Sequence, residues 1–185
     1  NISPALLKMQ FKTSLYRLRH AVGQYTILFE GERYRFNHDI DYEYDLETYN
    51  DLLEKARAEK NTAKCAELLQ AAVDLVKGPY LVDVETEWAD TERSQFEMQY
   101  HSILIRLAEL YLELGQPERV IEICQTALSH NRMLEEAYQL MMRANGLLGD
   151  RDAVARVYKT CSKILNTDLG IKPSRETEKL YQYLI

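Results

Sequence analysis

The sequence predicts a mostly α-helical protein made of tetratricopeptide-like helical hairpins, preceded by a small unit of one helix and one β-hairpin. Three observations lead to this prediction. The second half of the chain repeats itself at the period of about 34 residues that is typical of tetratricopeptide units. Apolar residues recur at helical spacing from residue 46 onward, and two short β-rich runs lie within residues 25–36.

The composition is that of a globular protein and excludes a membrane protein. The chain has 185 residues, of which 46% are hydrophobic and 28% charged, which suits one domain of ordinary size or a larger one with a small companion. No apolar run approaches the roughly 18–20 residues that span a bilayer, and residues 1–10 do not resemble a signal peptide. Because the chain opens on Asn, we expect it to be a piece of a longer protein.

The cysteines indicate a reducing compartment. Cys65, Cys124 and Cys161 are far apart and form no CxxC pair. An odd, scattered set of this kind is typical of reduced thiols, and each lies in an apolar helical pattern. We therefore expect core packing for all three, and a cytoplasmic protein.

Charge is divided unevenly along the chain. Residues 1–37 hold six Lys or Arg and two Glu, a net charge of +4, whereas residues 38–185 hold 17 Lys or Arg and 27 Asp or Glu, a net charge of −10. Such asymmetry indicates one anion-facing segment on an acidic body. It also indicates a boundary within residues 37–45, and we expect domains at 1–40 and 41–185.

Residues 4–22 are predicted to form an amphipathic helix. Ser3 and Pro4 suit the N-cap and the first helical position, and Gly23 suits the C-terminal end. One face carries an apolar stripe that we expect to be buried. The stripe comprises Leu7, Phe11, Leu15, Leu18 and Val22.

A helix followed at once by a hairpin, here at residues 25–36 around Glu30-Gly31-Glu32, is the closing half of a winged helix-turn-helix. In that arrangement the helix enters the major groove of DNA and the hairpin touches the backbone. Base-facing positions are then Thr13, Tyr16, Arg17 and His20, and phosphate contacts come from Lys8, Lys12, Arg33 and Arg35. The alternative is an ordinary solvated basic face, since two glutamates at the hairpin tip are poor partners for phosphate.

The remainder of the chain is predicted to be helical hairpins. When the repeat is aligned so that Gly115 matches Gly149, five further pairs agree. These pairs are Leu114/Leu148, Val120/Val154, Ala127/Cys161, Leu107/Met141 and Ala108/Met142. A looser copy spans residues 49–76 and turns near Asn61. Tetratricopeptide-type units bury their apolar faces by stacking on one another, and Gly supplies the freedom that the inter-helix turn requires.

Three further segments complete the helical part. A helix is expected to begin after an Asp45 N-cap, and Gly78-Pro79 breaks the helical pattern before a long helix over residues 88–114. Trp88, at the start of that helix, is expected to pack, with a role as binding anchor as the alternative. Pro173-Ser174 starts a short closing helix that caps the stack.

Chemistry of the common enzyme classes is absent from the sequence. There is no phosphate-binding glycine loop and no GxSxG, and the four histidines are not spaced as metal ligands. We therefore expect no enzymatic activity, no cofactor and no metal.

Five segments in order resemble the bacterial transcriptional activator domain regulators, of the antibiotic-regulatory-protein type or the related large ATPase-linked activators. These segments are LYRLRHAVG, RYRFN followed by DLETY, KGPYL…EWADTER, LAELYLELGQPERVIEICQTAL, and DLGIKPSRETEKLY. The resemblance covers the whole chain. It implies a recognition helix at 5–22, a wing at 25–36 and an activator domain at 46–184. The first part of the winged domain is missing from this sequence.

The preferred hypothesis is a fragment of a transcription regulator that contacts promoter DNA through its first segment and contacts protein, or a second copy, through its helical repeats. The alternative is a helical-repeat adaptor without DNA contact, in which Thr13, Tyr16, Arg17 and His20 are covered by protein. A third possibility is a small-molecule sensor with a pocket lined by Tyr100, Tyr111, Tyr138 or Tyr158, which a filled interior would remove.

Overall fold

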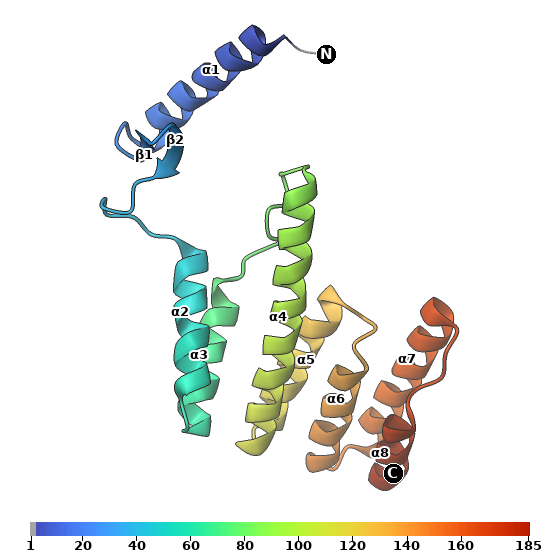
Figure 1. Ribbon diagram of the computed structural model, residues 1–185. Helices are drawn as coiled ribbons and strands as arrows, with labels where there is room; N and C mark the ends of the chain where they lie inside the picture. Colours follow the sequence, from blue (N-terminus) through green and yellow to red (C-terminus); the bar gives the residue numbers. More distant parts are fainter. Residues whose placement is uncertain (1–2) are drawn as a thin grey trace. The chain divides into compact units, whose positions relative to one another are not determined.

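The computed structural model describes residues 3–185, which form two units divided between Tyr44 and Asp45 (Figure 1). The first unit contains one helix and a two-stranded hairpin, and the second is entirely helical in its regular structure. The mostly α-helical fold predicted from the sequence is confirmed.

The first unit begins with α1 (Pro4–Val22), whose ends are those expected. The Leu6 amide donates to Ser3 Oγ at 3.3 Å, and Gly23 ends the helix with a φ of +104°. The hairpin pairs β1 (Ile27–Glu30) with β2 (Arg33–Phe36) in antiparallel fashion. Its two-residue turn, Gly31-Glu32, has positive φ at both positions, as a type I′ hairpin turn requires.

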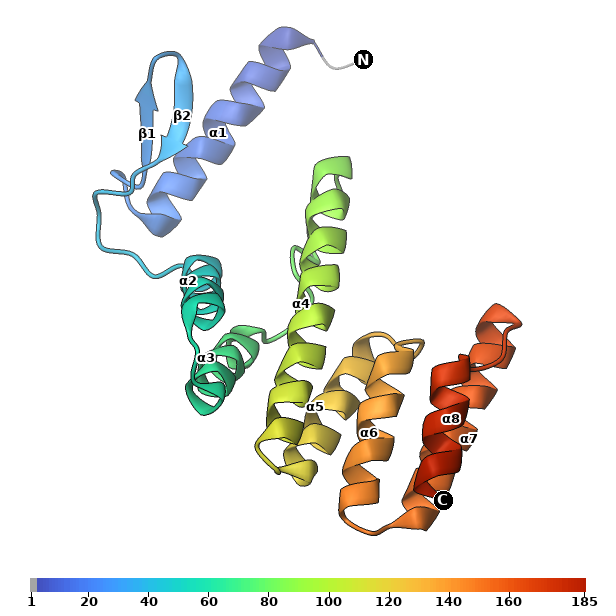
Figure 2. The same ribbon diagram turned by 60° about the horizontal axis from the view of Figure 1, so that its bottom comes forward.

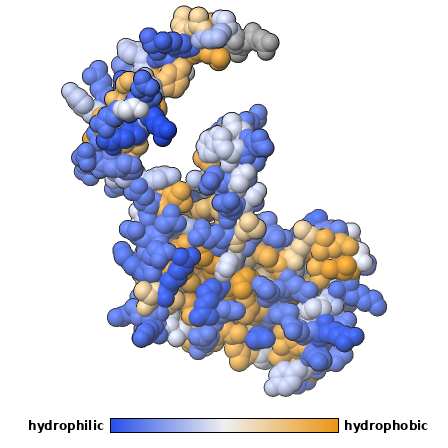
Figure 3. Space-filling view, viewed as in Figure 1, coloured by the Kyte–Doolittle hydropathy of each residue, from blue (hydrophilic) through white to orange (hydrophobic). Residues whose placement is uncertain are grey.

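The apolar stripe of α1 is exposed, so the expectation that it is buried was wrong for the described residues. None of the α1 residues is buried, and Leu7 and Phe11 are each 51% exposed. Figure 3 shows apolar side chains at the surface of this helix. The Tyr34 ring of the hairpin contacts Phe11, and Leu15 is partly buried, but one two-stranded hairpin is too small to cover a helix of this length.

The second unit consists of helical hairpins that stack in sequence order. Within it α4 contacts α3, α5 and α6, and the core lies along these contacts. The helices are α2 (Asp45–Ala58), α3 (Thr62–Leu75), α4 (Glu87–Glu113), α5 (Pro117–His130), α6 (Glu135–Leu147), α7 (Arg151–Leu169) and α8 (Arg175–Leu184). Asp45 is the first residue of α2 rather than its cap, and its carboxylate accepts from the Leu46 amide.

The predicted repeat is visible in the backbone. Gly115 and Gly149 both have a left-handed φ, of +66° and +74°. The amide after each glycine donates to a carbonyl five residues earlier, Gln116 to Tyr111 and Asp150 to Asn145. The equivalent side chains of Val120 and Val154, and of Ala127 and Cys161, are fully buried. The repeat is therefore confirmed for α4–α5 and α6–α7.

Helix α8 closes the stack, as predicted, by packing on α6 and α7 (Figure 2). Ser174 caps it by accepting from the Thr177 amide. Behind this cap the Glu135 carboxylate accepts from the Ser174 amide at 2.7 Å and from Thr177 Oγ1. Thr177 is fully buried, so the start of α8 is joined to the start of α6 through a closed polar contact.

The tyrosines considered as the lining of a sensor pocket pack against other side chains instead of lining a pocket. Tyr100, Tyr111 and Tyr138 are buried in the core, and Tyr158 stacks on Tyr181 with ring centroids 4.1 Å apart. The expected packing of the cysteines is confirmed in full for Cys124 and Cys161, which are buried, while Cys65 in α3 is half-buried against the core.

Trp88 corrects another expectation, because most of its surface is exposed rather than packed. It is 59% exposed, whereas the next residue, Ala89, is fully buried. Successive helical residues point about 100° apart, so the small alanine takes the position that faces the body and the indole faces outward.

Candidate nucleic-acid interface

Helix α1 presents Thr13, Tyr16, Arg17 and His20 on one exposed face. The spacings of three and four residues place them on adjacent turns of the same side. The rings of Tyr16 and His20 lie 6.2 Å apart, and Thr13 Oγ1 donates to the Met9 carbonyl at 3.0 Å. The predicted base-facing residues are thus together on a continuous surface of α1.

The lysines of α1 lie on the flank of this face. Lys8 and Lys12 are one turn apart and exposed. Residues 4–22 contain no Asp or Glu, so the helix offers these cations no carboxylate of its own. A solvated helix face ordinarily carries both signs of charge, and α1 carries one.

Arg19 has a structural role that the sequence did not reveal. Its Nη2 donates to the Ile27 carbonyl at 2.6 Å and holds β1 against α1, while its Nε is buried without a hydrogen-bond partner. The only signal in the sequence is its position, since Arg19 lies about 160° around the helix from Arg17.

The base of the hairpin is held by two buried polar residues. Thr26 Oγ1 donates to the Val22 carbonyl at 2.6 Å, and Asn37 Nδ2 donates to the Tyr25 carbonyl at 3.0 Å. The Asn37 amide also donates to the Thr26 carbonyl. These bonds connect the end of α1 to both strands and fix where the hairpin leaves the helix.

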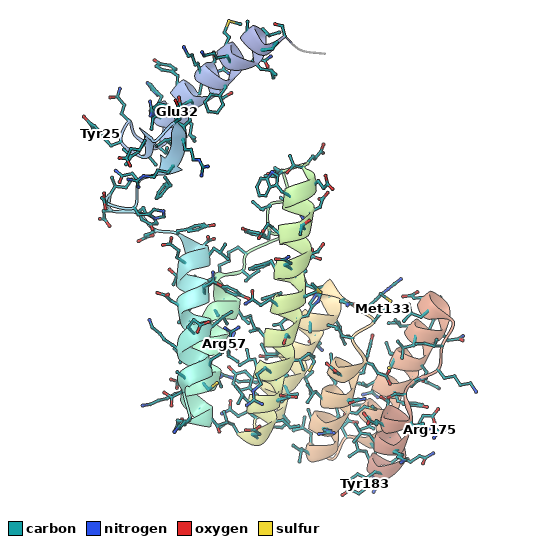
Figure 4. All side chains as sticks on the ribbon, viewed as in Figure 1. Tyr25, Glu32, Arg57, Met133, Arg175 and Tyr183 are labelled. Carbon is teal, nitrogen blue, oxygen red and sulfur yellow. The ribbon has the colours of Figure 1, made fainter. Side chains whose placement is uncertain are left out.

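The predicted wing cations, Arg33 and Arg35, alternate with Tyr34 along β2. Because the Tyr34 ring contacts Phe11 of α1, the two arginines lie on the hairpin face away from that helix. Arg35 donates to Glu30 Oε2 through Nε at 3.0 Å and through Nη2 at 2.8 Å. Of the two predicted phosphate-binding arginines of the hairpin, Arg35 is therefore paired with a carboxylate of the hairpin itself. Glu32, labelled in Figure 4, is exposed in the turn between β1 and β2.

The first unit therefore offers an acid-free helical face and a hairpin of mixed charge. Such a surface attracts polyanions through Lys and Arg and presents hydroxyl, phenol and imidazole groups for hydrogen bonds to base edges. The described residues hold no group of three or more His, Cys, Asp or Glu side chains arranged to ligate a metal ion. Within residues 3–185, no helix combines the length and apolar character that crossing a bilayer requires.

Curated relatives match nearly the whole chain. The regulatory protein AfsR of Streptomyces griseus is 27% identical over 186 residues, covering 98% of this chain and 19% of that protein. AfsR of Streptomyces coelicolor is 25% identical over 178 residues, covering 94% of this chain and 18% of its own length. The chain thus spans about a fifth of these relatives.

A solved structure has the same fold. The Mycobacterium tuberculosis EmbR structure, in complex with a low affinity phosphopeptide, aligns with all of this chain and 51% of its own, with a TM-score of 0.77 and 17% sequence identity. Residues 44–185 match the bacterial transcriptional activator domain, and these residues include the whole helical unit. The chain accordingly belongs to the bacterial transcriptional activator domain family.

Proposed function

We propose that this chain is part of a bacterial transcription regulator in which residues 1–40 contact promoter DNA and residues 41–185 contact protein, either a second copy or the transcription machinery, in the cytoplasm. The observation that carries the proposal is the exposed, acid-free face of α1, with Thr13, Tyr16, Arg17 and His20 on one side. Lys8, Lys12, Arg33 and Arg35 are assigned to phosphate contacts, with Arg35 exchanging Glu30 for phosphate.

Several features support this proposal over an adaptor without DNA contact. The hairpin is fastened to α1 through Arg19 and leaves the base-facing residues uncovered. The position of the hairpin directly after the helix is that of a wing. The membership of residues 44–185 in an activator-domain family adds the regulatory context.

The exposed apolar stripe of α1 affects how the proposal is tested. A recognition helix must be held rigidly against its own domain before it can be placed in a groove, and the described residues leave Leu7 and Phe11 half exposed. We therefore expect strong binding from the intact regulator and weak binding from residues 1–185 alone.

The test is a fluorescence-anisotropy titration of labelled DNA from the region upstream of the regulator's own gene. The intact regulator and this chain are titrated at a low and a high salt concentration. We expect the intact regulator to bind with an affinity that falls steeply with salt, the signature of phosphate neutralisation. Binding no tighter than that of an acidic control protein, by both, contradicts the DNA-contact proposal and favours the adaptor.

A further inference from the structure

One face of the first half of α4 is covered by the connection between α3 and α4. Arg93 fastens the α3–α4 connection to this face by donating to the carbonyls of Tyr80 at 3.1 Å, Leu81 at 2.8 Å and Val84 at 3.3 Å. Phe96, close to the same face, stacks on Tyr80 with ring centroids 4.9 Å apart. Figure 1 shows this connection running beside the start of α4.

The opposite face of the same segment is open. Trp88, Thr91, Gln95 and Met98 follow one another at spacings of three, four and three, which aligns them in a single stripe about 180° from Arg93. All four are exposed, Trp88 to 59% and Met98 to 65%. We call this stripe the α4 seam.

The seam is unlike an ordinary solvated helix face. Exposed Trp and Met side chains are enriched at protein interfaces, and a central indole is among the commonest energetic anchors of such contacts. The spacing of three and four residues is also that of a seam between two helices. A second helix laid along α4 would meet the indole at one end and the thioether at the other.

The charges beside the seam define the partner. Residues 87–98 contain four carboxylates, Glu87, Asp90, Glu92 and Glu97, and a single cation. That cation, Arg93, is engaged by three carbonyls and by Asp90 at 2.6 Å. At about 100° per residue, Glu87 and Glu92 lie on either side of the seam, whereas Asp90, which pairs with Arg93, and Glu97 lie nearer the covered face. The seam is therefore apolar at its ends and flanked by two carboxylates, which repels nucleic acid and attracts a basic polypeptide.

We propose that the α4 seam docks a basic amphipathic helix of a protein partner. Its apolar side chains cover Trp88 and Met98, and its Lys or Arg side chains pair with the carboxylates at the edges, with one cation lying over the indole. The inference rests on the proposed protein-contacting role of the helical unit and adds the surface and the chemistry of the partner.

Trp88 is the only tryptophan in the sequence, so fluorescence excited at wavelengths that the 13 tyrosines do not absorb reports on the seam alone. The probe is a short peptide with leucine and arginine at helical spacing, and its counterpart carries glutamate in place of arginine. We expect the arginine peptide to shift the Trp88 emission to the blue and to protect it from acrylamide. The glutamate peptide leaves the emission unchanged. Without peptide, and relative to free tryptophan amide, caesium should quench Trp88 more strongly and iodide less strongly.

Variants then locate the binding site by anisotropy of the labelled arginine peptide. Glu87→Gln with Glu92→Gln should weaken binding roughly three- to tenfold, and Met98→Lys should weaken it by about tenfold or more through like-charge repulsion. The matched control is Glu118→Gln with Glu122→Gln, two exposed acids on α5, which should leave binding unchanged. Far-UV circular dichroism melts of each variant verify folding, which exposed positions should barely alter.

Four outcomes overturn the inference. In the first, the arginine peptide leaves the Trp88 emission unchanged, and in the second, the glutamate peptide binds as tightly as the arginine peptide. In the third, the α5 control variant weakens binding as much as the Glu87 and Glu92 variant does. In the fourth, this chain forms a dimer that buries Trp88 in place of the peptide. DNA titration of the same substitutions made in the intact regulator, which is the form expected to bind DNA strongly, separates this inference from the proposed function. Failure at the seam with DNA binding intact removes the docking site alone, and the reverse result removes the DNA contact alone.

Discussion

Arg17 and Arg19 are two residues apart on α1 and have different roles. Arg17 is exposed on the face assigned to DNA, whereas Arg19 is half-buried and donates to the Ile27 carbonyl. A helix turns about 100° per residue, so side chains two residues apart point to nearly opposite sides, one toward solvent and the other toward the hairpin. Replacing each arginine by alanine in turn therefore tests the structural role of Arg19 separately from the proposed DNA-binding role of Arg17.

Arg19→Ala should loosen the hairpin while Arg17→Ala leaves it unchanged. A hydrogen bond from a charged donor contributes about 1.5–3 kcal/mol to stability. Without it, the Ile27 carbonyl has to accept a hydrogen bond from water instead. Amide hydrogen exchange of β1 and β2 in this chain measures the effect. Faster exchange in both variants, or in neither, contradicts the assignment of Arg19 as the anchor.

The elements of both units show how far sequence reasoning reaches. The repeat that relates Gly115 to Gly149, the caps at Ser3 and Ser174 and the break at Gly78 are local or periodic signals, and the structure confirms the elements they predict. The exposure of Trp88 and of Phe11 was not predictable, because it depends on which surfaces the rest of the fold leaves uncovered. The role of Arg19 likewise needs the position of a carbonyl in another element. The DNA-contact residues stay a prediction.

The inter-helix turns require glycine at two equivalent positions. Gly115→Ala and Gly149→Ala should each lower the free energy of unfolding by about 1 kcal/mol, since both have a left-handed φ that a Cβ disfavours. A Cβ at either position meets no atom within 4 Å, so the cost is conformational rather than steric. Urea unfolding followed by far-UV circular dichroism gives the values. Gly78→Ala, at an open position without positive φ, serves as control and should change stability by a few tenths of a kcal/mol.

The contact between α6 and α8 should depend on pH. Burial alone raises the pKa of Glu135, but hydrogen bonds from Thr177 and Ser174 outweigh it and lower the pKa below its ordinary value. A carboxyl whose pKa is lower in the folded state stabilises the fold above its unfolded pKa of about 4.5, and that contribution is lost as the pH falls through the folded pKa.

Glu135→Gln should therefore be less stable than the wild type at neutral pH, by about 1 kcal/mol, and the difference should shrink below about pH 4.5. Thermal melts of both proteins over this range measure it. A difference that is the same at pH 7 and at pH 3.5 would mean that the charge of Glu135 plays no part in holding α8.

At the scale of the whole molecule, the attraction to DNA that we propose has to arise from a basic segment on a chain whose net charge is −6. The net charge of residues 1–37 is +4, and the remainder repels phosphate. Each cation of residues 1–37 should then account for a larger share of the affinity than it would in a uniformly basic protein, where many cations share the phosphate contacts.

In the intact regulator, Lys12→Ala, at a position assigned to a phosphate contact, should reduce the slope of log affinity against log salt by about one. Arg17→Ala, at a base-facing position, should instead weaken binding to the promoter sequence more than binding to unrelated DNA. Lys159→Ala, which removes an exposed cation from α7, should leave the slope unchanged. Titrations at several salt concentrations give the slopes. Equal losses for Lys12→Ala and Lys159→Ala would show that total charge, rather than the α1 surface, governs binding.

The three cysteines lie one in the second helix of each hairpin, Cys65 in α3, Cys124 in α5 and Cys161 in α7. Burial raises the pKa of both Cys124 and Cys161 to about 12, so at neutral pH each is protonated and shielded until its own hairpin opens. A thiol reagent followed by mass spectrometry would therefore time the opening of each repeat separately, with Cys65 reacting first. The chain contains, in its native sequence, three separate reporters of how a stack of repeats comes apart.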